Sequence, residues 1–154
     1  MADDARGFRA ATGAEHLPEA GTGEREAAVR AALDGLRQIR RVMNTGAADP
    51  LAVPADWERL QPVRAVALVL EAAGIPPSAV DAQGRRVATG YRVTAAERPP
   101  VVRVEWLGPA GSGAVHQQQD ALRRCAEALG AMGWPALRYR GPRRQWFLEA
   151  EPRR

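Results

Sequence analysis

The sequence contains no lysine, and all 22 of its basic residues are arginine. Asparagine, isoleucine and serine are also scarce, whereas alanine is abundant. This bias is typical of a protein encoded by a GC-rich bacterial or phage genome. The arginine content alone therefore does not indicate nucleic-acid binding, and the formal net charge is only +4.

Cysteine and long apolar runs are almost absent. A single cysteine, Cys125, excludes an intrachain disulfide and favours a reducing compartment. The longest apolar run covers residues 65–70, far short of the ~20 residues that a membrane helix needs. The N-terminus is acidic and lacks the apolar core of a signal peptide. We therefore expect a soluble cytoplasmic protein without membrane contact.

The length and composition match one small globular domain. The chain has 154 residues, of which 45% are hydrophobic and 26% are charged. These values exclude a collagen-like repeat, a disulfide scaffold, a wholly disordered chain and a two-domain enzyme with a cofactor cleft. Residues 1–22 show little apolar periodicity and are predicted to form a mobile N-terminal tail. Residues 23–154 are predicted to form a single domain.

The first part of that domain, residues 23–77, shows helical patterns. Apolar residues recur at helical spacing over residues 24–43, with glutamates near the start and arginines near the end. A short helix is predicted over residues 54–60. A second main helix follows from Pro62 to about residue 73, where glycine and two prolines end it.

The second part, residues 84–152, reads as a ββαββ unit. Strands are indicated by alternating apolar and polar residues, and a helix by a stripe of apolar residues at steps of three and four. The predicted elements are strands near 87–94 and 102–106, a helix over 115–132, and strands near 137–140 and 146–150. The predicted fold class is α+β: two N-terminal helices, then an antiparallel sheet of about four strands with one helix across a face.

The strongest candidate site is the tip of the last hairpin. Residues 98–154 carry a net charge of +5, whereas residues 1–50 carry −1 and residues 51–97 carry 0. Guanidinium groups bind phosphates, and aromatic rings stack on bases, so the cluster fits nucleic acid or an acidic partner. A solvated turn whose arginines protect an edge strand is the simpler explanation of the same cluster. The candidate contact residues are Arg138, Tyr139, Arg140, Arg143, Arg144 and Phe147.

The helix over residues 24–43 is a candidate docking element. It is amphipathic and basic, and it lies far in sequence from the ββαββ unit. It has no Trp or Phe, which disfavours binding to a membrane surface. We expect it to contact a partner or a second copy through Arg30, Leu33, Arg37, Arg40 and Arg41.

Other residues carry weaker signals. The glycine-rich segment 108–113 lacks the spacing of a phosphate-binding loop, and His116 with Asp120 gives only two of the ligands that a zinc site needs. Cys125 lies on the apolar stripe and is expected to be buried. Glutamines 117–119 are expected to belong to a solvated helix face. We predict no cofactor, no metal and no catalytic residue.

These features favour a small non-catalytic binding or assembly protein that acts through protein–protein contacts, including self-association. The alternative is a nucleic-acid-binding accessory or regulatory protein that uses the basic C-terminal hairpin. An enzyme is not expected, because no nucleophile, base and acid converge in the sequence.

Overall fold

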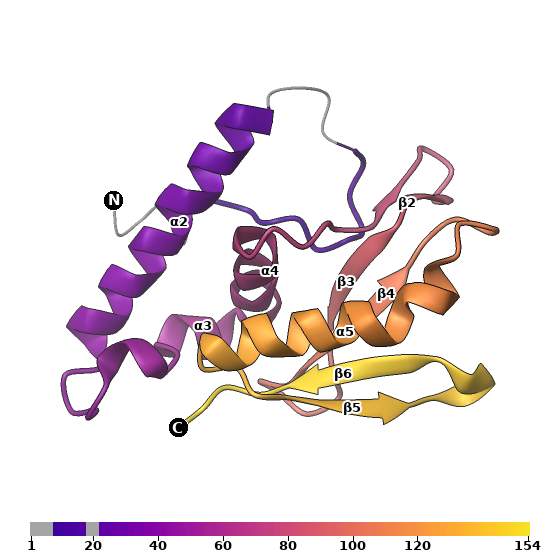
Figure 1. Cartoon of the computed structure of the whole chain (residues 1–154). Helices are drawn as coiled ribbons and strands as arrows, with labels where there is room; N and C mark the ends of the chain where they lie inside the picture. The colour runs from indigo at the N-terminus through magenta and orange to yellow at the C-terminus, as the bar shows by residue number, and fades with distance from the viewer. Residues whose placement is uncertain (1–7, 18–21) are drawn as a thin grey trace.

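The computed structural model describes residues 8–17 and 22–154 and has the predicted α+β architecture. Helices come first in the chain, and one long helix separates two pairs of strands in the second half (Figure 1). In chain order the elements are α2 (Thr22–Met43), η1 (Pro50–Ala52), α3 (Asp56–Leu60), α4 (Pro62–Ala72), β1 (Ala79–Val80), β2 (Arg86–Ala88), β3 (Gly90–Ala95), β4 (Val102–Leu107), α5 (Ala114–Ala131), β5 (Ala136–Arg140), η2 (Pro142–Arg144) and β6 (Trp146–Ala150).

Four strands form one antiparallel sheet in the order β3-β4-β6-β5. β3 and β4 are consecutive, as are β5 and β6, and α5 connects the two pairs. β6 returns to the middle of the sheet beside β4, with Val104 opposite Leu148, which leaves β5 at an outer edge. The predicted ββαββ unit is therefore confirmed.

The core lies between this sheet and the helices. α4 and α5 pack on the same face of the sheet (Figure 1). Alternate strand residues point into that layer, which explains the burial of Tyr91, Val104 and Leu148. α5 contributes the predicted apolar stripe at helical spacing, and α2 packs its own apolar stripe against α4. In the described ranges, no helix is both long and apolar enough to cross a bilayer.

The strand predicted near residues 87–94 is divided in the structure. β2 pairs with β1 in a small second sheet, and β3 belongs to the main sheet. The division is at Thr89, where the chain leaves one sheet for the other. Gly90 follows, and a Cβ there would lie 2.2 Å from the Pro76 carbonyl oxygen. Only glycine allows this close approach of two backbone segments.

The prediction of a mobile tail needs correction for residues 8–17. This segment lies along β3: the Val93 amide donates to the Thr12 carbonyl, and the Tyr91 hydroxyl donates to the Ala11 carbonyl at 2.7 Å. The Glu71 side chain accepts a hydrogen bond from the Ala11 amide at 2.8 Å. Backbone hydrogen bonds hold the segment, so its lack of apolar periodicity did not predict its position. The rest of the predicted tail, at 1–7 and 18–21, lies outside the described residues.

Candidate functional site

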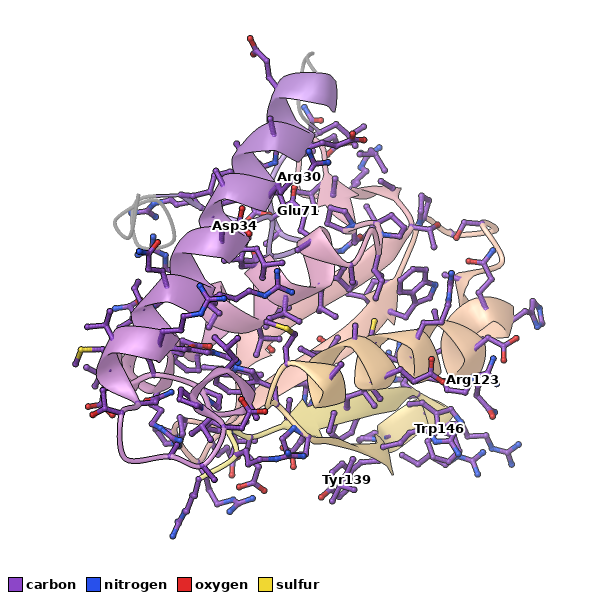
Figure 2. The ribbon with its side chains drawn as sticks, turned by 60° about the vertical axis from the view of Figure 1, so that its left-hand side comes forward. Arg30, Asp34, Glu71, Arg123, Tyr139 and Trp146 are labelled. Atoms are coloured by element: carbon purple, nitrogen blue, oxygen red, sulfur yellow. The ribbon has the colours of Figure 1, made fainter. Side chains whose placement is uncertain are left out.

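The β5–β6 hairpin gathers the predicted C-terminal residues, but it places them on two different faces. Arg140 pairs with Trp146 across the strands, and Tyr139 pairs with Phe147. Neighbouring pairs point to opposite sides of a sheet. Figure 2 shows Trp146 on the side toward α5 and Tyr139 on the side that points away from it.

On the side toward α5, two arginines contact one tryptophan. The guanidinium carbons of Arg138 and Arg140 lie 4.9 and 5.5 Å from the centre of the Trp146 ring. These are cation–π distances, so both charges lie close to the same ring. The Trp146 backbone amide donates to the Gln118 side chain at 2.9 Å, which fixes the hairpin to α5.

The turn of the hairpin presents two more arginines in an uncommon backbone conformation. Arg143 and Arg144 both have φ of 60°, in the left-handed region that favours glycine. Both side chains are exposed. Throughout the part of the chain that the structure describes, no carboxylate forms an ion pair with Arg138, Arg140, Arg143 or Arg144. We name these four residues the hairpin arginines.

On the side away from α5, the hairpin carries an aromatic stack. The rings of Tyr139 and Phe147 are 5.8 Å apart at an angle of 23°. The guanidinium carbon of Arg103 on β4 lies 3.9 Å from the centre of the Phe147 ring. This contact was not identified from the sequence. The alternation of residues along β4 showed the face, and only the strand order could show the neighbour.

This side of the main sheet is a broad surface that we name the bare face. No helix within 8–17 or 22–154 packs on it. Two cross-strand rows form its centre. The first row is Arg92, Glu105, Phe147 and Tyr139, and the second is Thr94, Arg103, Glu149 and Leu137. A hollow of about 700 Å³ lies over β3 and β4, and its walls carry three arginines and three glutamates.

The two edges of the main sheet differ. Beside β3, the Tyr91 amide donates to the Pro76 carbonyl, and the Val93 amide donates to Thr12 as described above. The outer side of β5 has no such cover among the described residues. Because backbone groups alternate between the two sides of a strand, Arg138 and Arg140 direct their amides outward from that edge. β5 is thus the open edge of the sheet. The residues whose amides point outward in its second half, Arg138 and Arg140, are both charged.

The predicted docking surface on α2 is only partly available. Arg30 and Arg41 are exposed, and Leu33 and Arg37 are half-buried. Arg40 is fully buried, which corrects its assignment to a docking surface. Its guanidinium donates two hydrogen bonds to Glu58, at 2.8 and 2.7 Å, so it closes an ion pair inside the protein.

The weaker candidates have structural positions that do not converge on a reaction centre. Cys125 is buried, and burial raises the pKa of its thiol to about 12. Asp120 pairs with Arg123 at 3.4 Å. In the described part of the chain, no group of three or more His, Cys, Asp or Glu side chains is placed to hold a metal ion. Gln117 and Gln119 are exposed as expected, whereas Gln118 is buried under the hairpin.

Comparisons with known proteins give no functional lead. The chain matches no protein-family model, no curated protein and no solved structure. A functional argument for it therefore depends on the hairpin arginines and the bare face.

Proposed function

We propose that this protein is a non-catalytic assembly protein that binds a second copy of itself through the bare face. The observation that carries the proposal is that one face of the main sheet is packed against helices while the other exposes an aromatic stack. Leu137, which lies beside that stack, has 65% of its surface exposed. Exposed apolar patches bordered by polar groups are typical of protein-binding sites.

The composition of the bare face supports a protein partner over other ligands. Tyrosine and arginine are enriched among the residues that dominate protein–protein binding, and both lie here in one cluster. Tyr139 and Phe147 provide the apolar centre, and the Arg103 guanidinium lies over the Phe147 ring. The charged side chains around the hollow provide the polar rim that such interfaces have.

A second copy fits this face because its charges are of both signs. Arg103 and Glu149 are cross-strand neighbours, and neither forms an ion pair within the described residues. A two-fold axis through the face can therefore bring arginines of one copy against glutamates of the other. Pairing between two β5 edges is disfavoured, since it brings Arg138 and Arg140 close to the same arginines of the second copy.

The experiment is sedimentation velocity over a wide range of protein concentration. The wild-type protein should reach a mass of about twice 16.6 kDa as concentration rises. Leu137→Glu should remain monomeric, because it places a negative charge in the centre of the interface. Leu60→Glu is the matched control, since Leu60 is 79% exposed but lies on α3, and it should still dimerise.

Two outcomes would refute the assignment. One is a wild-type protein that stays monomeric at every concentration. The other is dimerisation that Leu137→Glu and Leu60→Glu weaken equally, which would mean that the contact is not on the bare face. Circular dichroism of each variant checks that the substituted chain is folded.

A further inference from the structure

The hairpin arginines form a positive surface separate from the bare face. Arg138 and Arg140 lie on the side of β5 toward α5, and Arg143 and Arg144 extend from the turn. Arg123 lies at the same end of the molecule in Figure 2, but it is paired with Asp120. Glu149, the nearest acid along β6, belongs to the opposite face of the sheet. The four charges are therefore not neutralised by any acid among the described residues.

The spacing of these arginines suits a repeating anion. Residues two apart on a strand are separated by about 6.8 Å, which is similar to the spacing of successive phosphates along a nucleic-acid strand. Contact with Trp146 restrains the guanidinium groups of both Arg138 and Arg140. Guanidinium groups bind phosphate through two parallel hydrogen bonds. The cluster can thus contact neighbouring phosphates without a large loss of side-chain freedom.

The backbone of the turn gives an independent indication. A non-glycine residue with positive φ is strained, and this turn contains two in succession. Glycine or asparagine would fit both positions better. Strained residues concentrate at functional sites, where the side chain is needed in spite of its conformational cost. Arg143 and Arg144 are consistent with that pattern.

We infer that the hairpin arginines bind duplex nucleic acid by contacting its phosphates, in addition to the self-association proposed above. A two-stranded β-ribbon fits the major groove of a duplex. Single-strand binding by base stacking is disfavoured here: Trp146 is covered by Arg138 and Arg140, and Tyr139 is stacked on Phe147. An acidic protein is also disfavoured, because among the described residues no exposed large apolar side chain lies within the cluster of four arginines itself.

The test is fluorescence anisotropy of the full chain with a labelled short DNA duplex at increasing salt. Four phosphate contacts predict a slope of log K against log salt of about −3 to −4. The variant R138Q/R140Q/R143Q/R144Q should bind at least about tenfold more weakly at low salt, with a slope near zero. The same variant should keep the wild-type sedimentation behaviour, so this inference and the proposed function can fail separately.

A matched control removes four other exposed or half-exposed arginines. The variant R30Q/R37Q/R41Q/R85Q has the same net charge as R138Q/R140Q/R143Q/R144Q. It should bind the duplex within about twofold of wild type. Equal loss in both variants would overturn the inference, because binding would then reflect net charge alone. If poly-glutamate displaced the labelled duplex as well as unlabelled duplex does, the inference would also be overturned, and an acidic protein partner would be indicated. Absence of binding at low salt would overturn it directly.

Discussion

Two regions of this molecule use the same side chain in opposite ways. In the helical half, Arg40 of α2 has 0% of its surface exposed. Each of its three guanidinium nitrogens donates a hydrogen bond, and two of these bonds go to Glu58. Its third donor contacts the Leu51 carbonyl at 2.8 Å. At the C-terminal hairpin, four arginines are exposed, and none of them forms an ion pair with an acid in the part of the chain that the structure describes. Composition cannot separate these roles, since both regions contain arginine for every basic residue.

The difference is set by the carboxylate. Glu58 accepts from Arg40 and also from the Ala55 amide and the Trp134 indole, at 2.8 and 3.3 Å. This network joins α2, α3 and the segment after α5, so the buried pair fixes the arrangement of three elements. The hairpin arginines have no carboxylate partner among the described residues, and two of them contact the Trp146 ring. Their charge is therefore available for a ligand.

The largest expected effect comes from breaking the buried pair. Arg40→Met leaves Glu58 charged and without its main partner, so the free energy of unfolding should fall by about 3–5 kcal/mol. Arg40→Lys keeps the charge but loses the bidentate geometry, and it should lose less. Urea denaturation of both variants measures the difference. Arg41→Met is the control at the next position, and it should change stability by less than about 0.5 kcal/mol.

The contrast would be broken if Arg40→Met and Arg41→Met unfolded at the same urea concentration. Arg40→Lys keeps the experiment informative if Arg40→Met does not fold. In that case its midpoint should lie measurably below that of Arg41→Met.

An intermediate effect is expected at the half-exposed pair of Arg25 and Glu71. Glu71 accepts from Arg25 at 2.7 and 2.9 Å and from the Ala11 amide, so Glu71→Gln weakens three charged hydrogen bonds. We expect a loss of about 1–3 kcal/mol in the free energy of unfolding. Hydrogen exchange at Val93 should also rise, because residues 8–17 would be held less firmly over β3. Asp34→Asn, beside Arg37 at 3.9 Å, should have almost no effect. Equal effects of the two variants would contradict this ranking.

The smallest effect should have the opposite sign. Arg143→Gly and Arg144→Gly relieve a positive φ, and each should raise the free energy of unfolding by up to about 1 kcal/mol. Arg140→Gly removes the same charge from an extended position, and it should lower stability by a similar amount. Chemical denaturation of the three variants decides the point. A loss of stability in Arg143→Gly would show that the turn arginine contributes to the fold.

The sequence predicted the periodic elements well. Apolar residues at helical spacing located α2 and α5, and alternation located β4 and the β5–β6 hairpin. Each of these elements buries one face, and this burial requires apolar residues to recur at a regular spacing in the sequence. The position of the hairpin arginines was also predicted, because a turn between two strands with alternating apolar residues can be recognised from local sequence alone.

What the sequence did not predict depends on contacts between distant residues. Arg40 follows the polar pattern of an exposed helix end, and only Glu58 in a different element explains its burial. Gln118 looks like part of a solvated face until the hairpin is placed over it. The bare face has the same origin, since Arg103 and Phe147 meet only after β6 inserts beside β4. No local pattern encodes these pairs.

The cover over β3 has a consequence for the order of events during synthesis. The Ala11 carbonyl and the Tyr91 hydroxyl that bind each other are 80 positions apart. Residues 8–17 therefore leave the ribosome long before the strand on which they dock. The first-made segment has to wait for β3 before it can dock, and contacts of such long sequence separation form slowly. A nascent chain that has completed β3 but not this docking step exposes an unpaired strand, which is the state most prone to aggregate.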